Sequence, residues 1–216
     1  MKFFLISFFV SCLFNYKAFS LDTIAKQAIL YDYETKTIIF EKNSEELMSP
    51  SSMSKIMTIY YVFKKIKDGD LKLTDKFKIS KKAWKKGGSK MFVNVNTMVS
   101  VEDLIRGIIV QSGNDACIAI AEGISGSEAL FAEELNLLAK EIGMLNSSFT
   151  NSTGWPDPDH LTTIQDLLIL TVRTIEDFPE LYYYYAEKEF TYSGIKQLNR
   201  NPLLFNEINA DGLKTG

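Results

Sequence analysis

The sequence is poor in the residues that hold metals and disulfides, with two cysteines and one histidine among 216 residues. That leaves almost no material for a structural zinc site or a disulfide framework, and a catalytic triad would have to use His160, the single histidine. Neither sign of charge is in excess, since 24 Lys and Arg residues stand against 27 Asp and Glu residues. Nucleic-acid-binding domains are usually strongly basic, so we expect no nucleic-acid partner, and also no metal and no cofactor.

Apolar runs long enough to cross a bilayer are also missing. The run at residues 3–14 follows Lys2 and precedes Ala18-Phe19-Ser20, which is the pattern of a secretory signal peptide. Twelve apolar residues are too few to span a membrane comfortably, so the pattern favours a cleaved signal over a retained anchor. We therefore expect residues 1–20 to be a signal peptide and residues 21–216 to be exported across the cytoplasmic membrane as one domain.

The first part of that domain combines strands with a buried helix. Residues 28–33 and 37–42 are apolar or β-branched around a short polar turn, which predicts a hairpin. A helix is expected to begin at Ser49-Pro50, and its apolar residues up to Ile66 cover most of its circumference, which indicates burial. The basic stretch at residues 81–90 is interpreted as a solvated loop.

From residue 100 the pattern is mainly helical. Capping boxes at residues 100–103 and 162–165 each mark a helix start, and the second of these helices should extend to about Phe178. Two more helices are expected, at residues 115–124 and 128–142. The remaining expected features are a loop at residues 154–160 and strands at residues 188–192 and 212–215. Strands, then a block of helices, then strands predict an α+β fold, mixed α/β with a helical insertion.

Ser52 and Lys55 lie near the start of the expected buried helix. Residues three apart share one face of a helix, so the lysine amine can come within hydrogen-bond reach of the serine hydroxyl. Serine needs a base that takes its proton, and lysine can be that base only if burial and the positive end of a helix lower its pKa. The apolar surroundings of this helix favour such a shift. Taken alone, however, the spacing is common and has little specificity.

Two further short motifs follow in the chain. Ser112-Gly113-Asn114 comes after an apolar segment, and its hydroxyl and carboxamide can point side by side from a loop. Lys214-Thr215-Gly216 is expected on a strand, where the glycine allows a ligand to approach the main chain closely. Each motif is weak alone. In this order and context, S-x-x-K, S-x-N and K-T-G match the motif set of penicillin-binding proteins and β-lactamases.

The residues around the three motifs extend this match. The chain resembles the low-molecular-mass penicillin-binding proteins, serine-type D-alanyl-D-alanine carboxypeptidases of peptidase family S11, over essentially all of residues 21–216. The resemblance implies a β-lactamase/transpeptidase-like fold, an antiparallel sheet with a helical subdomain. It also implies a location in the periplasm, at the outer face of the inner membrane. The matching segments are residues 50–58, 105–107, 110–116, 199–201 and 211–216.

The resemblance also implies a role for each motif residue. Ser52 would attack the carbonyl between the two terminal D-alanines of the peptidoglycan stem peptide and become an acyl-enzyme. Lys55 would take the serine proton, and Ser112 would relay a proton toward the leaving D-alanine. β-Lactams mimic the dipeptide and would be trapped on Ser52. The implied substrate-binding residues are Asn114 for the substrate backbone, Lys214 and Thr215 for the terminal carboxylate, and Gly216 for close approach of the strand.

In this family, further strands complete the sheet after the K-T-G strand, and one N–H of the oxyanion hole comes from just beyond it. A β-rich C-terminal domain and an amphipathic helix that associates with the inner membrane often follow. Because the sequence ends at Gly216, we expect a catalytic domain truncated at the K-T-G strand, with the C-terminal strands of the sheet missing and low activity. The other oxyanion donor, the N–H of Ser52, is retained.

Three alternative functions remain open. A class A β-lactamase needs a glutamate on a loop after the second motif, and the one candidate pair, Glu133-Glu134, lies inside an expected helix. The second motif also has Gly113 where those enzymes have aspartate. A DD-endopeptidase would use the same residues as the carboxypeptidase. The third alternative is a non-catalytic peptidoglycan-binding fragment.

Three other conspicuous features are interpreted as structural. His160 lies in the expected loop at residues 154–160, where a structural role or a place at the rim of a cleft is favoured over a metal site. Cys117 is expected to be a small core residue, and the tyrosines at residues 182–185 are expected to be half-buried packing.

Overall fold

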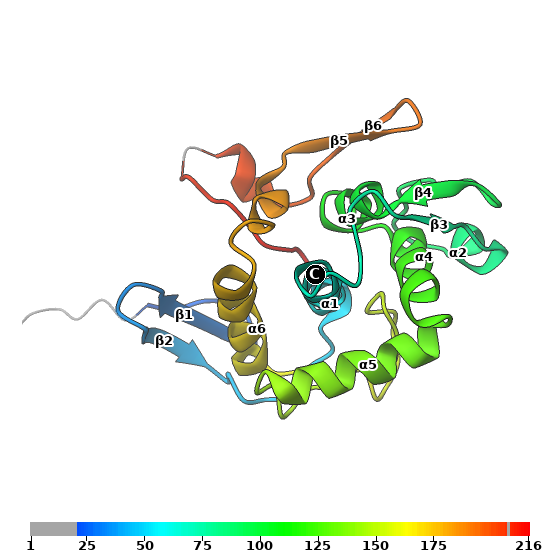
Figure 1. Ribbon diagram of the computed structural model, residues 1–216. Coiled ribbons are helices and arrows are strands. Elements are labelled where there is room, and N and C mark those ends of the chain that lie inside the picture. Colours follow the sequence, from blue (N-terminus) through cyan, green and yellow to red (C-terminus); the bar gives the residue numbers. More distant parts are fainter. Residues whose placement is uncertain (1–20, 207) are drawn as a thin grey trace, which may run out of the picture.

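The structure, a computed structural model, describes residues 21–206 and 208–216. The expected signal peptide at residues 1–20 lies outside the described residues and stays a prediction. In the described part, several helices alternate with short antiparallel sheets, which confirms the mixed α/β class (Figure 1). None of the helices in that part is both long and apolar enough to span a bilayer.

Helix α1 (Lys55–Lys67) lies at the centre of the molecule, as its apolar circumference predicts (Figure 1). Its first nine residues are buried. Side chains of the surrounding helices form one hydrophobic cluster with it, and each buried Leu- or Ile-sized side chain stabilises the fold by about 1.5–3 kcal/mol. The surrounding helices are α3 (Val101–Ile109), α4 (Asn114–Ser125), α5 (Glu128–Glu141) and α6 (Ile164–Asp177). Helices α4 and α5 confirm the predictions at residues 115–124 and 128–142.

Two helix starts use side-chain caps of the kind that the sequence indicates. The Ser100 hydroxyl accepts a hydrogen bond from a backbone N–H in the first turn of α3, as predicted. At α6 the cap is Thr163, which accepts the N–H of Asp166, and not Thr162. Thr162 instead exchanges two backbone hydrogen bonds with Met48. Because this pairing keeps Thr162 extended, the helix begins one residue later than predicted.

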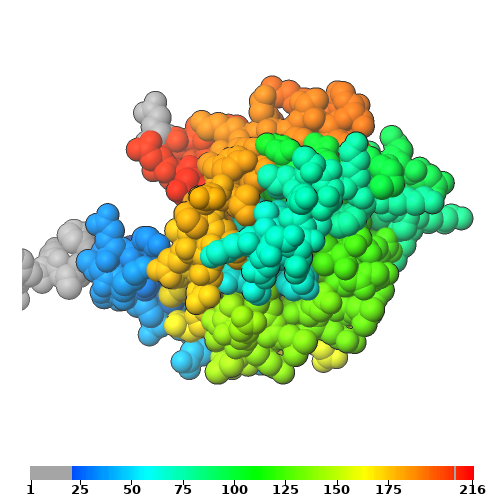
Figure 2. Space-filling model, in the orientation of Figure 1, coloured from blue at the N-terminus to red at the C-terminus, as the bar shows by residue number. Residues whose placement is uncertain are grey.

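The strands form three separate two-stranded antiparallel sheets among the described residues. The first is the predicted hairpin of β1 (Ala28–Asp32) and β2 (Thr37–Lys42), which projects from one side of the body (Figures 1 and 2). Strand β5 confirms the prediction at residues 188–192. The other two sheets pair β3 (Lys76–Lys78) with β4 (Met98–Ser100) and β5 (Glu189–Tyr192) with β6 (Ile195–Leu198).

The basic stretch at residues 81–90, expected to be a loop, begins with the short helix α2 (Lys81–Lys85). Ser80 caps this helix by accepting the N–H of Ala83, and the Ala83 side chain is fully buried. Helix α2 packs against α4, while most of its lysines face solvent. The prediction was wrong because a cap and one buried alanine are enough to hold a single helical turn within a run of charge.

Residues 212–215 are not a strand in the structure, contrary to the prediction. A strand requires hydrogen bonds to a neighbouring strand, and none of the strands in the described residues pairs with this segment. Residues 213–214 and strand β1 instead lie on the walls of one open groove of about 580 Å³, together with α1 and α6. The segment is held elsewhere, since the Asn201 side chain donates a hydrogen bond to the Gly212 carbonyl at 2.8 Å.

Candidate active site

Ser52 and Lys55 face one another at the N-terminal end of α1. The chain reaches this helix through a 3-10 turn, η1 (Ser51–Ser54), that follows Pro50. Lys55 Nζ donates one hydrogen bond to the Ser52 hydroxyl at 3.0 Å and another to the Thr153 carbonyl at 2.5 Å. The amine therefore lies within reach of the hydroxyl, as the spacing of the two residues predicts.

The surroundings of Lys55 favour a neutral amine. The side chain is 1% exposed, and burial lowers the pKa of Lys55 because the charged form loses its hydration. The positive charges of Arg200 and Lys86 lower this pKa further. Cys117 supplies no counter-ion near neutral pH, since burial raises the pKa of its thiol to about 12. Cys117 is fully buried, which confirms its prediction as a core residue.

His160 supports the turn that precedes Lys55. The Ser54 hydroxyl donates to the Ser51 carbonyl at 2.8 Å and accepts a hydrogen bond from His160 Nε2 at 2.7 Å. His160 Nδ1 accepts the N–H of Thr150 at 3.2 Å, which assigns the ring proton to Nε2. Burial lowers the pKa of His160, so the ring is neutral near neutral pH. The structural interpretation of this histidine is confirmed, although it lies in the interior and not at a rim.

Ser112 lies in the loop between α3 and α4 with a backbone φ of 62°, which is uncommon for a residue other than glycine. Its side chain is buried, and among the described residues its hydroxyl has no hydrogen-bond partner. Leaving a buried polar group unbonded costs about 1–3 kcal/mol. Such a hydroxyl, held in a strained loop, is a position at which a bound molecule can supply the missing partner.

Asn114 and Asp115 attach a neighbouring segment to the start of α4. The Asn114 carboxamide donates to the Gly87 carbonyl at 2.9 Å, and its backbone N–H donates to the Ser89 carbonyl at 2.8 Å. The buried Asp115 carboxylate accepts the backbone N–H groups of residues 91–93 at 2.9 to 3.2 Å. Asp115 was not among the residues predicted for the site. A signal was present, because a carboxylate in the first turn of a helix is stabilised by the helix dipole.

Lys214 lies close to the start of α1, on the wall of the same groove as Met53 and Ile56. Burial, and after it the charge of Lys55, lowers the pKa of Lys214 to about 7. Its ammonium donates a hydrogen bond to the Thr215 carbonyl at 2.9 Å. Gly216 lies beside Met53, because a Cβ built on this glycine would be 3.4 Å from Met53 Cγ. The K-T-G segment therefore lies over the N-terminal end of α1 (Figure 1).

The three motifs thus approach one region, but not all of their side chains touch. Within residues 21–206 and 208–216, no hydrogen bond joins the Asn114 or Thr215 side chain to Ser52. The same part of the chain contains no cluster of His, Cys, Asp and Glu that could hold a metal ion. The Thr153 carbonyl was not predicted, because a backbone acceptor leaves no signal in the pattern of side chains.

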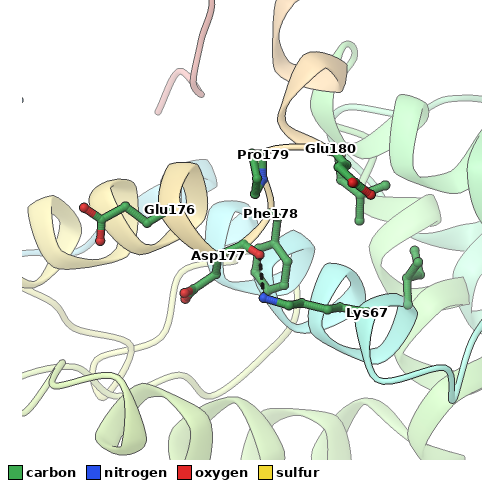
Figure 3. Close-up of a pocket in the computed structure, with 8 residues that line it drawn as sticks. Lys67, Glu176, Asp177, Phe178, Pro179 and Glu180 are labelled. Carbon is green, nitrogen blue, oxygen red and sulfur yellow. Dashed lines mark hydrogen bonds between the residues drawn. The ribbon is translucent and has the colours of Figure 1, made fainter.

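A second hollow, of about 520 Å³, lies at the other end of α1 (Figure 3). It is bounded by the C-terminal ends of α1 and α6, where Lys67 donates a hydrogen bond to the Asp177 carbonyl at 2.9 Å. Helix α1 has thirteen residues and is therefore about 20 Å long, so this hollow is remote from Ser52. We assign it no part in the chemistry.

Comparison with known proteins identifies the family. Residues 15–216 match the model of peptidase family S11, described as D-alanyl-D-alanine carboxypeptidase. The chain belongs to this family. DacA of Haemophilus influenzae, a D-alanyl-D-alanine carboxypeptidase, is 42% identical over 196 residues, which is 89% of this chain and 50% of that protein. DacC of Escherichia coli, with the same activity in its name, is 41% identical over 199 residues, with the same two shares.

Solved structures related to this S11 peptidase chain have the same fold. Penicillin-binding protein 5 from Haemophilus influenzae superposes with a TM-score of 0.86 at 42% identity, over 89% of this chain and 57% of that one. DacD from Francisella tularensis also has a TM-score of 0.86, at 33% identity, over 91% and 60%. The penicillin-binding-protein fold that the family resemblance implied is confirmed. The S11 chain spans about half the length of the curated relatives it matches.

Proposed function

We propose that this S11 peptidase acts as a serine D-alanyl-D-alanine carboxypeptidase that removes the terminal D-alanine from peptidoglycan stem pentapeptides. The observation that carries the proposal is the 3.0 Å hydrogen bond between the buried Lys55 amine, with its lowered pKa, and the Ser52 hydroxyl. Two relatives at 41% and 42% identity bear the name of that activity, which supports the same reading.

In the acylation step, the neutral Lys55 amine takes the Ser52 proton while Oγ attacks the carbonyl between the two D-alanines. The backbone N–H of Ser52 donates to the oxyanion that forms. The Ser112 hydroxyl, which has no partner among the described residues, passes a proton from the Lys55 ammonium to the nitrogen of the leaving D-alanine. The C–N bond breaks, and the shortened peptide remains as an ester on Ser52.

Deacylation reverses these proton movements. Lys55 takes a proton from a water molecule, whose oxygen attacks the ester carbonyl. The bond between that carbon and Ser52 Oγ then breaks, Lys55 returns the proton to Oγ, and the shortened peptide leaves. Throughout, the Asn114 carboxamide binds the peptide backbone, and the Lys214 ammonium and Thr215 hydroxyl bind the terminal carboxylate. Gly216 allows the main chain to lie against the substrate. A β-lactam acylates Ser52 in the same way. Its amide nitrogen is part of the opened ring and cannot leave, so the whole molecule stays attached to Ser52.

The cellular setting is part of the proposal. A periplasmic location follows from the signal-like pattern at residues 1–20, which lie outside the described residues. The substrate, the cell-wall stem peptide, is found in that compartment. Association with the inner membrane through a C-terminal segment, and the extent of the catalytic domain at residues 21–216, stay predictions from the family resemblance.

Covalent labelling with fluorescent penicillin tests the nucleophile. We expect the protein to be labelled and Ser52→Ala to lose the label entirely, because within residues 21–206 and 208–216 the Ser52 hydroxyl is the one that hydrogen-bonds to the Lys55 amine. Ser49→Ala is the matched control, since Ser49 is exposed three residues upstream and should leave labelling unchanged. Label that persists in Ser52→Ala, or that maps to another serine by peptide mass, excludes the proposed nucleophile.

Product analysis separates the carboxypeptidase from its alternatives. We expect free D-alanine from diacyl-Lys-D-Ala-D-Ala and slow hydrolysis, at most, of a chromogenic cephalosporin. The β-lactamase candidate Glu134 lies on α5, where its carboxylate accepts the hydroxyls of Tyr61 and Ser125 and is not free to activate water. A D-alanyl-D-alanine endopeptidase of Escherichia coli is 27% identical over 146 residues, so cross-linked peptide is the third substrate to test. Faster cleavage of that peptide would favour the endopeptidase.

A further inference from the structure

A cation and an aromatic ring border the proposed substrate site beside Asn114. The cation is Lys86, at the C-terminal end of α2, and the ring is that of Trp155, in the loop after Thr153. The Lys86 ammonium lies 3.9 Å from the centre of the Trp155 ring, which is a cation–π contact. Neither side chain touches the substrate in the mechanism above, although the charge of Lys86 contributes to the lowered pKa of Lys55.

The turn after α2 ties this pair to Asn114. The Asn114 carboxamide donates to the carbonyl of Gly87, which directly follows Lys86. A Cβ built on Gly88 would lie 2.7 Å from Asn114 Nδ2 and 3.3 Å from the Trp155 ring. The carboxamide and the indole therefore flank the same glycine. Lys86 and Trp155 accordingly adjoin the residue that is proposed to bind the substrate backbone.

Trp155 is held firmly while its ring remains accessible. Its backbone N–H donates to Asn151 Oδ1 at 2.9 Å and to Thr153 Oγ1 at 3.1 Å, and its carbonyl accepts from Asn151 Nδ2 at 3.1 Å. The Thr153 carbonyl is the one that binds Lys55. Because 43% of Trp155 is exposed on a fixed backbone, a ligand can pack against the ring with little loss of conformational freedom.

The Lys86 ammonium has no carboxylate partner among residues 21–206 and 208–216. Partial burial lowers the pKa of Lys86, so its charged form gains from a nearby anion. The negative charge of Glu128 partly opposes this shift, but the Glu128 carboxylate is already bound by Lys82 at 2.8 Å and by the Ser152 hydroxyl at 2.9 Å. A ligand carboxylate can supply that anion.

We propose that Lys86 and Trp155 form a subsite that selects stem peptides whose residue before D-Ala-D-Ala has a side chain ending in a carboxylate. The inference rests on the proposed function. The K-T-G segment, assigned to the terminal carboxylate, ends at Gly216 beside Met53, just before α1, whereas Asn114 is tied to the turn after α2. A peptide that touches both places its preceding residue beside that turn. Its apolar stem then lies on the indole, and its carboxylate meets the ammonium.

Two peptides that differ in one group test the subsite on the full-length protein. They are acetyl-L-2-aminopimelyl-D-alanyl-D-alanine and the same peptide with the side-chain carboxylate replaced by a carboxamide. We expect kcat/KM for release of D-alanine to favour the acid by roughly two- to fivefold, as for a partly exposed ion pair. Lys86→Gln should bring this acid-to-amide ratio close to one. Lys85→Gln, which removes the same charge from the adjacent exposed residue, should leave the ratio unchanged.

The two readouts separate the subsite from the proposed function. Release of D-alanine from the carboxamide peptide reports the reaction, and the acid-to-amide ratio reports the subsite. If neither peptide is cleaved, the proposed function fails, and the ratio is then measured as the binding of both peptides to Ser52→Ala. A ratio near one in the parent protein, a ratio that survives Lys86→Gln, or an equal fall in Lys85→Gln overturns the subsite.

Discussion

The backbone of Gly154 passes so close to the Ser51 carbonyl that no side chain fits between them. A Cβ built on Gly154 would lie 1.8 Å from the Ser51 oxygen, and the φ of this glycine is +75°. Ser51 itself has a φ of 49°, and its carbonyl also accepts the Ser54 hydroxyl. The loop at residues 154–160, which the structure confirms, and the turn that carries Ser52 therefore hold each other in position.

Gly154→Ala should destabilise the protein and displace Ser52, the proposed nucleophile. An alanine at positive φ costs about 1–2 kcal/mol, and overpacking against a backbone oxygen adds roughly 1–3 kcal/mol. Gly126→Ala is the control, because Gly126 has a similar φ of +77° and open space within 4 Å. Urea unfolding should show a larger loss of unfolding free energy for Gly154→Ala, together with slower penicillin acylation. Equal losses in both variants would mean that the contact with Ser51 is unimportant.

Lys55→Arg should slow acylation by about 10²–10⁴-fold, the usual contribution of a general base. Arginine keeps the positive charge but cannot release its proton near neutral pH, so Ser52 would lose its base. Lys64→Arg is the control on the same helix, because Lys64 forms a surface ion pair with Asp68. This variant should be acylated at the normal rate. Rates of penicillin labelling, with thermal melts to confirm folding, give the comparison. Near-normal acylation of Lys55→Arg would remove Lys55 from its proposed role.

The pH profile of kcat/KM for the D-Ala-D-Ala peptide should be bell-shaped. Its rising limb reports the loss of the Lys55 proton, because only the neutral amine accepts a proton from Ser52. Its falling limb reports Lys214, whose pKa of about 7 means that the cation is lost as the pH rises above 7. Lys214→Arg stays charged and should extend activity to higher pH. A falling limb that is unchanged in Lys214→Arg would assign it to another group.

Stability should fall as the pH decreases below 6.5, in part because of His160. Burial lowers the pKa of His160 below 6.5 in the folded state, so in this range the unfolded chain binds a proton that the folded protein does not. Stability therefore rises with pH up to 6.5 and falls below it. Protonation of Nδ1 would also remove the acceptor for the Thr150 N–H. His160→Gln cannot titrate, so the difference in melting temperature between pH 7.5 and pH 5.5 should be smaller for this variant than for the parent protein. Identical differences would contradict this account.

The sequence by itself determined the features that depend on near neighbours. The three-residue spacing of Ser52 and Lys55 places both on one helix face, and the apolar circumference of α1 requires burial. The Ser100 cap, the helix within 128–142 and the hairpin at residues 28–42 likewise follow from patterns within a few residues. Local periodicity is sufficient here because the interacting groups are neighbours in the chain.

Only the tertiary structure decided the contacts between distant segments. The Thr153 carbonyl reaches Lys55 across 98 positions, and His160 reaches Ser54 across 106. Helix α2 and the segment at residues 212–215 were mispredicted for the same reason. A buried alanine against α4 stabilises the helix, and residues 213–214 of the second segment line a groove where a strand partner was expected. Backbone acceptors, burial and strand pairing depend on which segments meet in three dimensions, and no local pattern of side chains encodes that meeting.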